Sequence, residues 1–148
     1  MNLLGVMEVS GSALQAERIR AEVVAANMAN AETTRTADGG PYRRQEVVFS
    51  SEAPSHAFAT RLSSASGPTD PSIGGVRVSA VVTDSSSPLR RYDPGNPDAD
   101  KDGYVAYPDI NPLTEMVDLM GATRAYGLNS SAIQAEKGMI SASLDILK

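Results

Sequence analysis

Hydrophobic residues recur at intervals of seven along the first thirty residues of the chain. The repeat is formed by Met7, Leu14, Ala21 and Met28, with Leu3 and Val24 beside it. A repeat of seven sustained over this length keeps one seam of a helix facing a partner helix. The pattern therefore predicts a helix over 3–30, which either pairs with another helix or packs as a plain amphipathic helix on its own domain.

The last segment, residues 112–147, carries a longer repeat with the same spacing. Its members are Leu119, Tyr126, Ile133, Ile140 and Leu147, flanked by Met116 and Leu144. Pro112 suits the first turn of a helix, and the carboxylate of Glu115 favours the positive end of the helix dipole. Three glycines inside the segment each cost roughly 1 kcal/mol relative to alanine in a helix. We therefore expect a helix that is marginal by itself and depends on packing.

Between these segments the pattern changes to the alternation that is typical of strands. Strands are expected at 44–50 and 75–83, and weaker ones at 89–93 and 103–107. Residues 51–75 are rich in Ser, Ala, Pro and Gly, which indicates a flexible loop.

The predicted fold is mainly α with a small β-rich middle, in which long N- and C-terminal helices form an α-helical coiled-coil-like assembly domain. The expected divisions are an N-terminal assembly helix in 1–35, the β-rich middle in 36–110, and a C-terminal assembly helix in 111–148. A chain of 148 residues with only 5% aromatic residues and no tryptophan favours close helix–helix contact over a bulky core.

Composition narrows the classes of function. The net charge of −5, with no basic stripe, argues against a nucleic-acid partner. The absence of cysteine excludes disulfides, thiolate metal sites and cysteine catalysis. No apolar run approaches the roughly 18 residues of a membrane span. Because the N-terminus lacks a basic region and Glu8 interrupts its apolar stretch, we expect no cleavable signal peptide. The protein then either stays in the cytosol or leaves by another route.

An acidic stretch at 98–109 resembles the spacing of an EF-hand calcium loop. Its members are Asp98, Asp100, Asp102, Gly103 and Asp109. Prolines on both sides oppose the entering and leaving helices that an EF-hand requires. The stretch is therefore either a helix-free calcium loop or a set of turns, in which Asp side chains bond their own backbone and Gly supplies a positive φ.

An enzymatic function is not expected. His56 is the only histidine, so no histidine-based triad or metal cluster can be assembled around it. The crowded aspartates at 98–102 have no identified substrate pocket. We predict no catalytic residue, no metal site and no cofactor.

Four stretches together resemble the bacterial flagellar axial proteins, the rod and hook family. The stretch Ala26-Asn27-Met28-Ala29-Asn30 is similar to the signature that ends the family's first helix, and Asn111-Pro112-Leu113-Thr114-Glu115-Met116 followed by Arg124-Ala125-Tyr126 is similar to its C-terminal helix. Gly39-Gly40-Pro41-Tyr42-Arg43-Arg44-Gln45 and the stretch from Asp93-Pro94-Gly95-Asn96-Pro97 to Pro108 resemble the proximal rod branch of the family.

The resemblance implies a structural subunit of the proximal flagellar rod, the periplasmic shaft that transmits torque and surrounds the export channel. Members of the family leave through the flagellar type III export apparatus without a cleaved signal. Their end helices pair and pack against neighbouring subunits around the channel. The implied partners are other copies of the chain, the other proximal rod proteins, the distal rod protein, and the adaptor that joins the rod to the membrane ring, with no nucleic acid and no direct membrane insertion.

The residues expected at subunit interfaces lie on the seams of the two end helices or are polar groups beside them. They are Met7, Leu14, Val24, Asn27, Met28, Asn30, Glu115, Met116, Leu119, Arg124, Tyr126, Ile133, Ile140 and Leu147.

Polar members of this set have alternative interpretations. Asn27 and Asn30 are expected to bond across to a neighbouring helix and fix its register; alternatively, Asn30 only marks the helix end and Asn27 is solvated. Glu115 and Arg124 either form ion pairs across an interface or are solvated. Two arginine pairs, Arg43-Arg44 and Arg90-Arg91, either meet the 98–102 aspartates of an adjacent subunit or are solvated.

Overall fold

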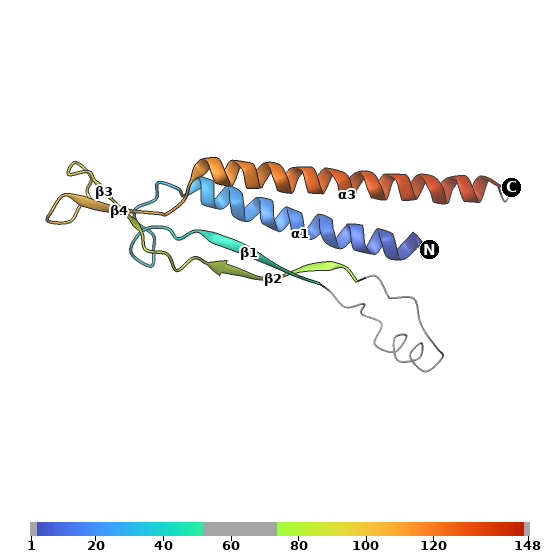
Figure 1. Cartoon of the computed structure of the whole chain (residues 1–148), viewed down its shortest axis with the longest axis horizontal. Coiled ribbons are helices and arrows are strands. Elements are labelled where there is room, and N and C mark those ends of the chain that lie inside the picture. The colour runs from blue at the N-terminus through green and yellow to red at the C-terminus, as the bar shows by residue number, and fades with distance from the viewer. Residues whose placement is uncertain (1–2, 52–73, 147–148) are drawn as a thin grey trace, which may run out of the picture.

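The computed structural model describes residues 3–51 and 74–146, which form an elongated molecule (Figure 1). Helix α1 (Leu3–Ala29) and helix α3 (Pro112–Ile146) lie side by side and run in opposite directions. With a rise of 1.5 Å per residue, they are about 40 Å and about 52 Å long. The start of α1 and the end of α3 therefore lie at one end of the molecule.

The two helices pack through a narrow and partly polar contact. Among the described residues, the buried apolar side chains of the two helices are Ala16, Val24 and Ala122, and Val105 and Ile110 are buried outside the helices. Four polar side chains, Ser10, Asn27, Glu115 and Glu136, are buried as well. Such a small core stabilises the helix pair weakly, because hydrophobic stabilisation is roughly proportional to the apolar area removed from water.

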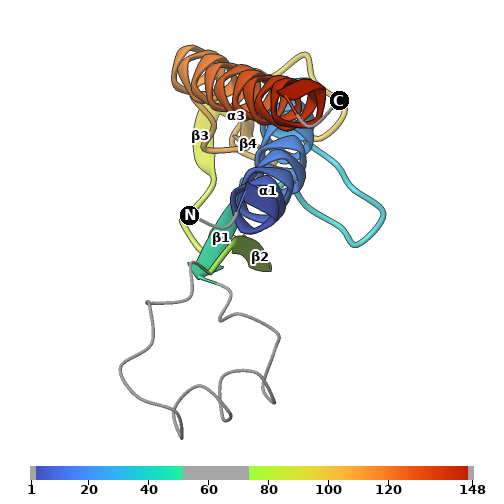
Figure 2. The same cartoon turned by 90° about the vertical axis from the view of Figure 1, so that its right-hand side faces the viewer.

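Strands β1 (Gln45–Ser51) and β2 (Val76–Thr83) form an antiparallel pair beside α1. Figure 2 shows α3, α1 and this pair stacked in that order. The backbone N–H of Val76 donates to the hydroxyl of Ser12 on α1 at 3.0 Å. A Cβ on Gly75 would lie 2.5 Å from the same oxygen, so glycine is needed for β2 to begin this close to the helix.

Strands β3 (Leu89–Tyr92) and β4 (Tyr104–Tyr107) form a second antiparallel pair, at the opposite end from the termini (Figure 1). Val105 of β4 is buried, and Tyr92 and Tyr104 stack edge to face with ring centroids 5.4 Å apart. The connection turns at Gly103, whose φ is +79°. It is tied to the segment after α1 because Thr34 donates to Asp98 at 2.8 Å.

The fold class and the order of elements predicted from the sequence are confirmed. The two long helices and the four strands begin and end close to the predicted positions. The predicted flexible loop, 51–75, lies almost wholly outside the described residues. Neither long helix in the described part of the chain has an apolar stretch sufficient to cross a bilayer.

Candidate functional site

Asn27, in the last turns of α1, is the centre of a buried polar junction. Its amide nitrogen donates to the backbone oxygen of Gln45 at 2.9 Å and to Oε2 of Glu115 at 3.0 Å. Its amide oxygen accepts from the backbone N–H of Gln45 at 2.9 Å and from the hydroxyl of Tyr42 at 3.2 Å. With 1% of Asn27 exposed, both donors and both acceptor sites of the amide are used inside the chain.

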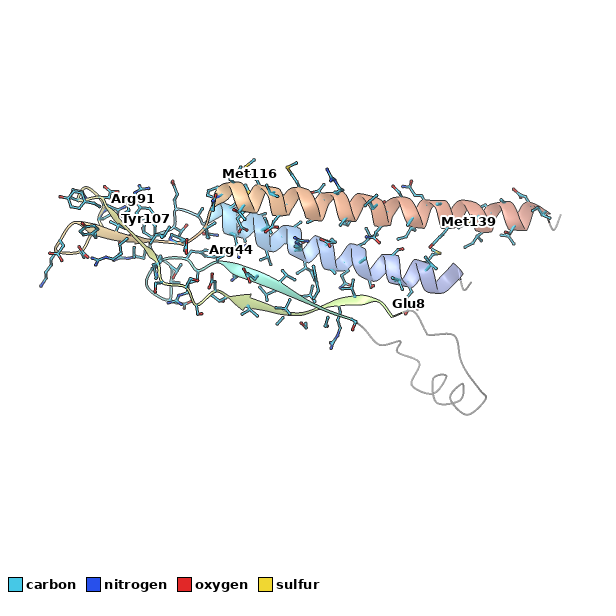
Figure 3. The ribbon with its side chains drawn as sticks, in the orientation of Figure 1. Glu8, Arg44, Arg91, Tyr107, Met116 and Met139 are labelled. Carbon is cyan, nitrogen blue, oxygen red and sulfur yellow. The ribbon has the colours of Figure 1, made fainter. Side chains whose placement is uncertain are left out.

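The second half of the junction is an ion pair between α3 and the residue before β1. Arg44 donates through Nε to Oε1 of Glu115 at 2.6 Å. Glu115 is 1% exposed, and a buried carboxylate is tolerated only when it is paired and hydrogen-bonded. The hydrogen bond to Glu115 raises the pKa of Arg44, while burial and then the Glu115 charge raise the pKa of Tyr42. Figure 3 shows Arg44 near the start of β1, on the side of the strand where the helices lie.

Local sequence places these groups. Asn111 caps α3 by accepting the N–H of Leu113 at 3.0 Å, which puts Glu115 in the first helical turn, where the dipole favours a carboxylate. Asn30 closes α1 by donating to the carbonyl of Ala26 at 2.9 Å. The junction therefore holds the end of α1, the start of β1 and the start of α3 in one arrangement.

The structure gives Asn27, Asn30 and Glu115 partners within the same chain. Asn27 does bond across to a neighbouring helix, but that helix is α3 of its own chain. Asn30 bonds its own helix and Thr33, in agreement with the alternative that it marks the helix end. Glu115 is buried and bound by Arg44 of the same chain, so it is not solvated. Arg44 also pairs with Glu46.

The predicted seam residues differ in how far the structure buries them. Those that are half-buried or buried along the α1–α3 pair are Met7, Leu14, Val24, Met28, Leu119, Ile133 and Ile140. Those that are exposed are Met116, Arg124 and Tyr126. Leu147 lies outside the described residues. The repeats of seven therefore serve first the pairing of the two helices in one chain, and a role in subunit contact stays a prediction.

Sequence reasoning missed a second apolar line on α3. It consists of Leu113, Val117, Met120 and Leu128, with Arg124 between the last two, and we call these five residues the outer stripe. The spacing of four, three, four and four residues places these side chains on one face of a helix. The exposed fractions are 70% for Leu113, 67% for Met120 and 67% for Leu128. Met116, beside the stripe, projects from the side of α3 turned away from α1 (Figure 3). The spacing of the stripe is a signal present in the sequence, but the repeat of seven indicates only the other face of the helix.

Residues 98–103 of the acidic stretch form turns between β3 and β4, and Asp109 lies beyond β4. Oδ1 of Asp100 accepts the N–H groups of Asp102 and Tyr104, both at 2.9 Å, and the first effect lowering the pKa of Asp100 is the bond from Tyr104. Strand β3 precedes the stretch where an EF-hand requires the entering helix, and strand β4 occupies residues 104–107 inside it. In residues 3–51 and 74–146, no group of three His, Cys, Asp or Glu side chains is placed to hold a metal ion. The turn geometry predicted for this stretch is confirmed, because Asp100 bonds its own backbone and Gly103 has a positive φ.

The arginines of β3 bind within the hairpin. Arg90 pairs with Asp100 of the same chain and lies 5.0 Å from the ring centroid of Tyr104. Arg91 lies over Tyr107 at 4.3 Å, as Figure 3 shows at that end of the molecule. One of the two interpretations of the sequence is contact between these arginines and the 98–102 aspartates of an adjacent subunit, whereas in the structure Arg90 pairs with an aspartate of its own chain.

Comparison with known proteins gives consistent matches. The family model described as "Flagella basal body rod protein" matches residues 7–35, and the model described as "Flagellar basal body rod FlgEFG protein C-terminal" matches residues 101–146. Neither matched range includes β1, β2 or the connection between them.

Relatives match almost the whole chain. A protein of Borreliella burgdorferi named "Flagellar basal-body rod protein FlgC" is 39% identical over 158 aligned residues, which cover 100% of this chain and 99% of the relative. Proteins with the same name from Bacillus subtilis and Salmonella typhimurium are 42% and 37% identical, and each covers at least 94% of both chains.

Proposed function

The chain belongs to the FlgC family of flagellar basal-body rod proteins, and from this membership we propose how it acts in the rod. It is a structural subunit of the flagellar basal body and not an enzyme. Such a subunit assembles with copies of itself and with other rod components. Its activity is then the formation of stable contacts along a shaft.

We propose that the subunit occupies the proximal, periplasmic part of the rod and reaches it through the flagellar type III export apparatus. Its neighbours there are the other proximal rod proteins, the distal rod protein and the adaptor that joins the rod to the membrane ring. The marginal core supports this route, because a chain held by few buried side chains unfolds at low cost for passage through a narrow channel.

The two end helices and the β-rich middle of the chain have different roles in this proposal. We propose that α1 and α3 form the assembly layer around the channel and that the β-rich middle lies outside it. The buried junction of Asn27, Arg44 and Glu115 fixes how the two layers are joined in each subunit. The half-buried seam residues then act indirectly, by holding α3 against α1.

The observation that carries the assembly role is the outer stripe. Large apolar side chains in water are costly, and an exposed line of them on a single helix marks an interaction surface. A shaft that transmits torque needs such contacts on every subunit. We propose that neighbouring rod subunits cover the outer stripe in the assembled rod.

Deletion of the gene, followed by motility assays and electron microscopy of basal bodies, tests the function. We expect rods to be absent and motility to be lost, and the wild-type gene to restore both. A Val117→Asp variant should fold, since the side chain is exposed, but should not restore rods. Gln134→Asp, an exposed change on the same helix outside the stripe, is the matched control and should restore them. Rods that form without the gene would contradict the proposal.

A further inference from the structure

A cleft of about 320 Å³ lies between β1 and the two helices. Its apolar lining consists of Val23, Val24, Val47 and Phe49. Phe49 keeps 38% of its surface exposed, although it lies on the side of β1 that carries the cleft. The chain therefore leaves an apolar surface open beside its own core.

The rim of this cleft is charged, with three carboxylates against two guanidinium groups. The carboxylates are Glu46, Glu115 and Asp118, and the guanidinium groups are Arg20 and Arg44. Glu115 is buried and fully used by the junction. Asp118 is held loosely, at 3.4 Å from Arg20 and 3.8 Å from Arg44, and it stays partly exposed, as does Glu46. The rim thus has a net charge of −1 and two carboxylates that water can reach.

Arg124 is the charge complement of this rim. It lies in the middle of the outer stripe, and among the described residues it has no hydrogen-bond or ion-pair partner. Gly121 and Gly127 stand three residues before and after it, and apart from the adjoining backbone of α3 no described residue comes within 4 Å of where their Cβ atoms would be. A partner can therefore approach the helix closely here. Any partner that buries the apolar stripe must supply a carboxylate to Arg124, because a buried unpaired charge is strongly unfavourable.

We propose that the outer stripe of one copy docks in the cleft of a second copy, with Arg124 paired to the carboxylates of Glu46 and Asp118. This inference rests on the proposed rod function, and it names the partner of the stripe. A second copy supplies both properties that the stripe requires, an apolar lining and an acidic rim. Stripe and cleft are different surfaces, so the contact is heterologous and continues from copy to copy instead of closing on a pair.

Cysteine cross-linking in rods tests the contact, because the chain has no cysteine of its own. Two tagged versions are expressed together in cells that lack the natural gene, one carrying Met120→Cys in the stripe and the other Phe49→Cys in the cleft. A short bis-maleimide should give a product of two copies of 15.5 kDa that carries both tags. Glu22→Cys, on an exposed face of α1, replaces Phe49→Cys in the control and should give no such product.

Charge reversal gives a second readout that does not depend on the cysteines. Arg124→Glu should lower the amount of subunit in purified rods by roughly tenfold or more, because like charges then face each other across the contact. Glu46→Arg in the same chain should restore much of the loss. Lys137→Glu, an exposed reversal on α3 about 140° around the helix from Arg124, is the matched control and should have little effect.

The outcomes separate this inference from the function on which it rests. If the subunit is found in rods but Met120→Cys cross-links to a different protein, or to no position in the cleft, the copy-to-copy contact is wrong and the rod function stands. The same holds if Glu46→Arg fails to rescue Arg124→Glu. If the wild-type subunit is absent from purified rods, the function itself is wrong.

Discussion

At the scale of single residues, Asn27 connects three segments that lie far apart in the sequence. It bonds Gln45, 18 residues away, and Glu115, 88 residues away. A sequence can indicate that an asparagine on a helix seam has a polar partner, but it does not say which one. The pairing of Arg44 with Glu115 could not be predicted for the same reason, since the two residues are 71 positions apart and Arg44 has a nearer carboxylate in Glu46.

Replacement of Asn27 with Leu should destabilise the isolated chain by about 2–3 kcal/mol, because buried groups of Gln45 and Glu115 lose their hydrogen bonds. Urea unfolding followed by circular dichroism measures the change. Asn129→Ala is the control: Asn129 donates only to the carbonyl of Ala125 in its own helix, and its loss should cost clearly less. If the two variants lose the same free energy of unfolding, the hydrogen bonds of the buried junction contribute no more to stability than an exposed bond within a helix.

The pKa of Asp100 should lie below the usual value of about 3.9, because the N–H of Tyr104 stabilises the carboxylate in the folded hairpin. A lowered folded-state pKa stabilises the hairpin at pH values above the unfolded pKa, and this contribution is lost as the pH falls through the lowered value. NMR titration of the Asp100 carboxyl checks the midpoint. A midpoint at or above the usual value would contradict the turn geometry.

At the scale of elements, periodicity was sufficient to predict both long helices and the four strands of the described residues near their observed ends. Its success for α3 has a physical reason: three members of the repeat, Leu119, Ile133 and Ile140, are half-buried along the α1–α3 pair, so the pattern and the packing largely coincide. The outer stripe was missed because α3 is apolar on two faces, and a single repeat describes only one. The pairing of α1 with α3 was one of the two alternatives left open for the first helix.

The glycines of the chain should respond to alanine in opposite directions. Gly103→Ala should destabilise the isolated chain by about 1–2 kcal/mol, because its φ of +79° disfavours a Cβ. Gly121→Ala should stabilise the chain by about 1 kcal/mol, because the helix interior favours alanine and, apart from the adjoining backbone of α3, no described residue lies within 4 Å of the new Cβ. Thermal unfolding measures both effects. If Gly121→Ala destabilises the chain, the isolated chain itself requires a residue without a Cβ at this position.

Gly121→Ala also distinguishes the stability of the free subunit from its incorporation into the rod. If a neighbour packs closely on the outer face of α3, Gly121→Ala should reduce incorporation into rods although it stabilises the free chain. A glycine that lowers the stability of the chain and raises that of the assembly explains why α3 keeps a residue unfavourable to helices.

At the scale of the whole molecule, the chain is a long helix pair with a hairpin at one end and a large exposed apolar surface along α3. The polar junction fixes the internal arrangement, and the outer stripe is left for contacts with other subunits. This distribution suits a building block, because stability that a single copy lacks is supplied when neighbours cover its surface.

Maleimide labelling of a Val117→Cys variant, in the free chain and in purified rods, tests most directly whether neighbours cover the outer stripe. The cysteine should react rapidly in the free chain, since Val117 is exposed, and should be strongly protected in the rod. Rapid labelling in both states, in rods that contain the variant at normal levels, would show that the stripe faces water in the assembly and would contradict its role as the assembly surface.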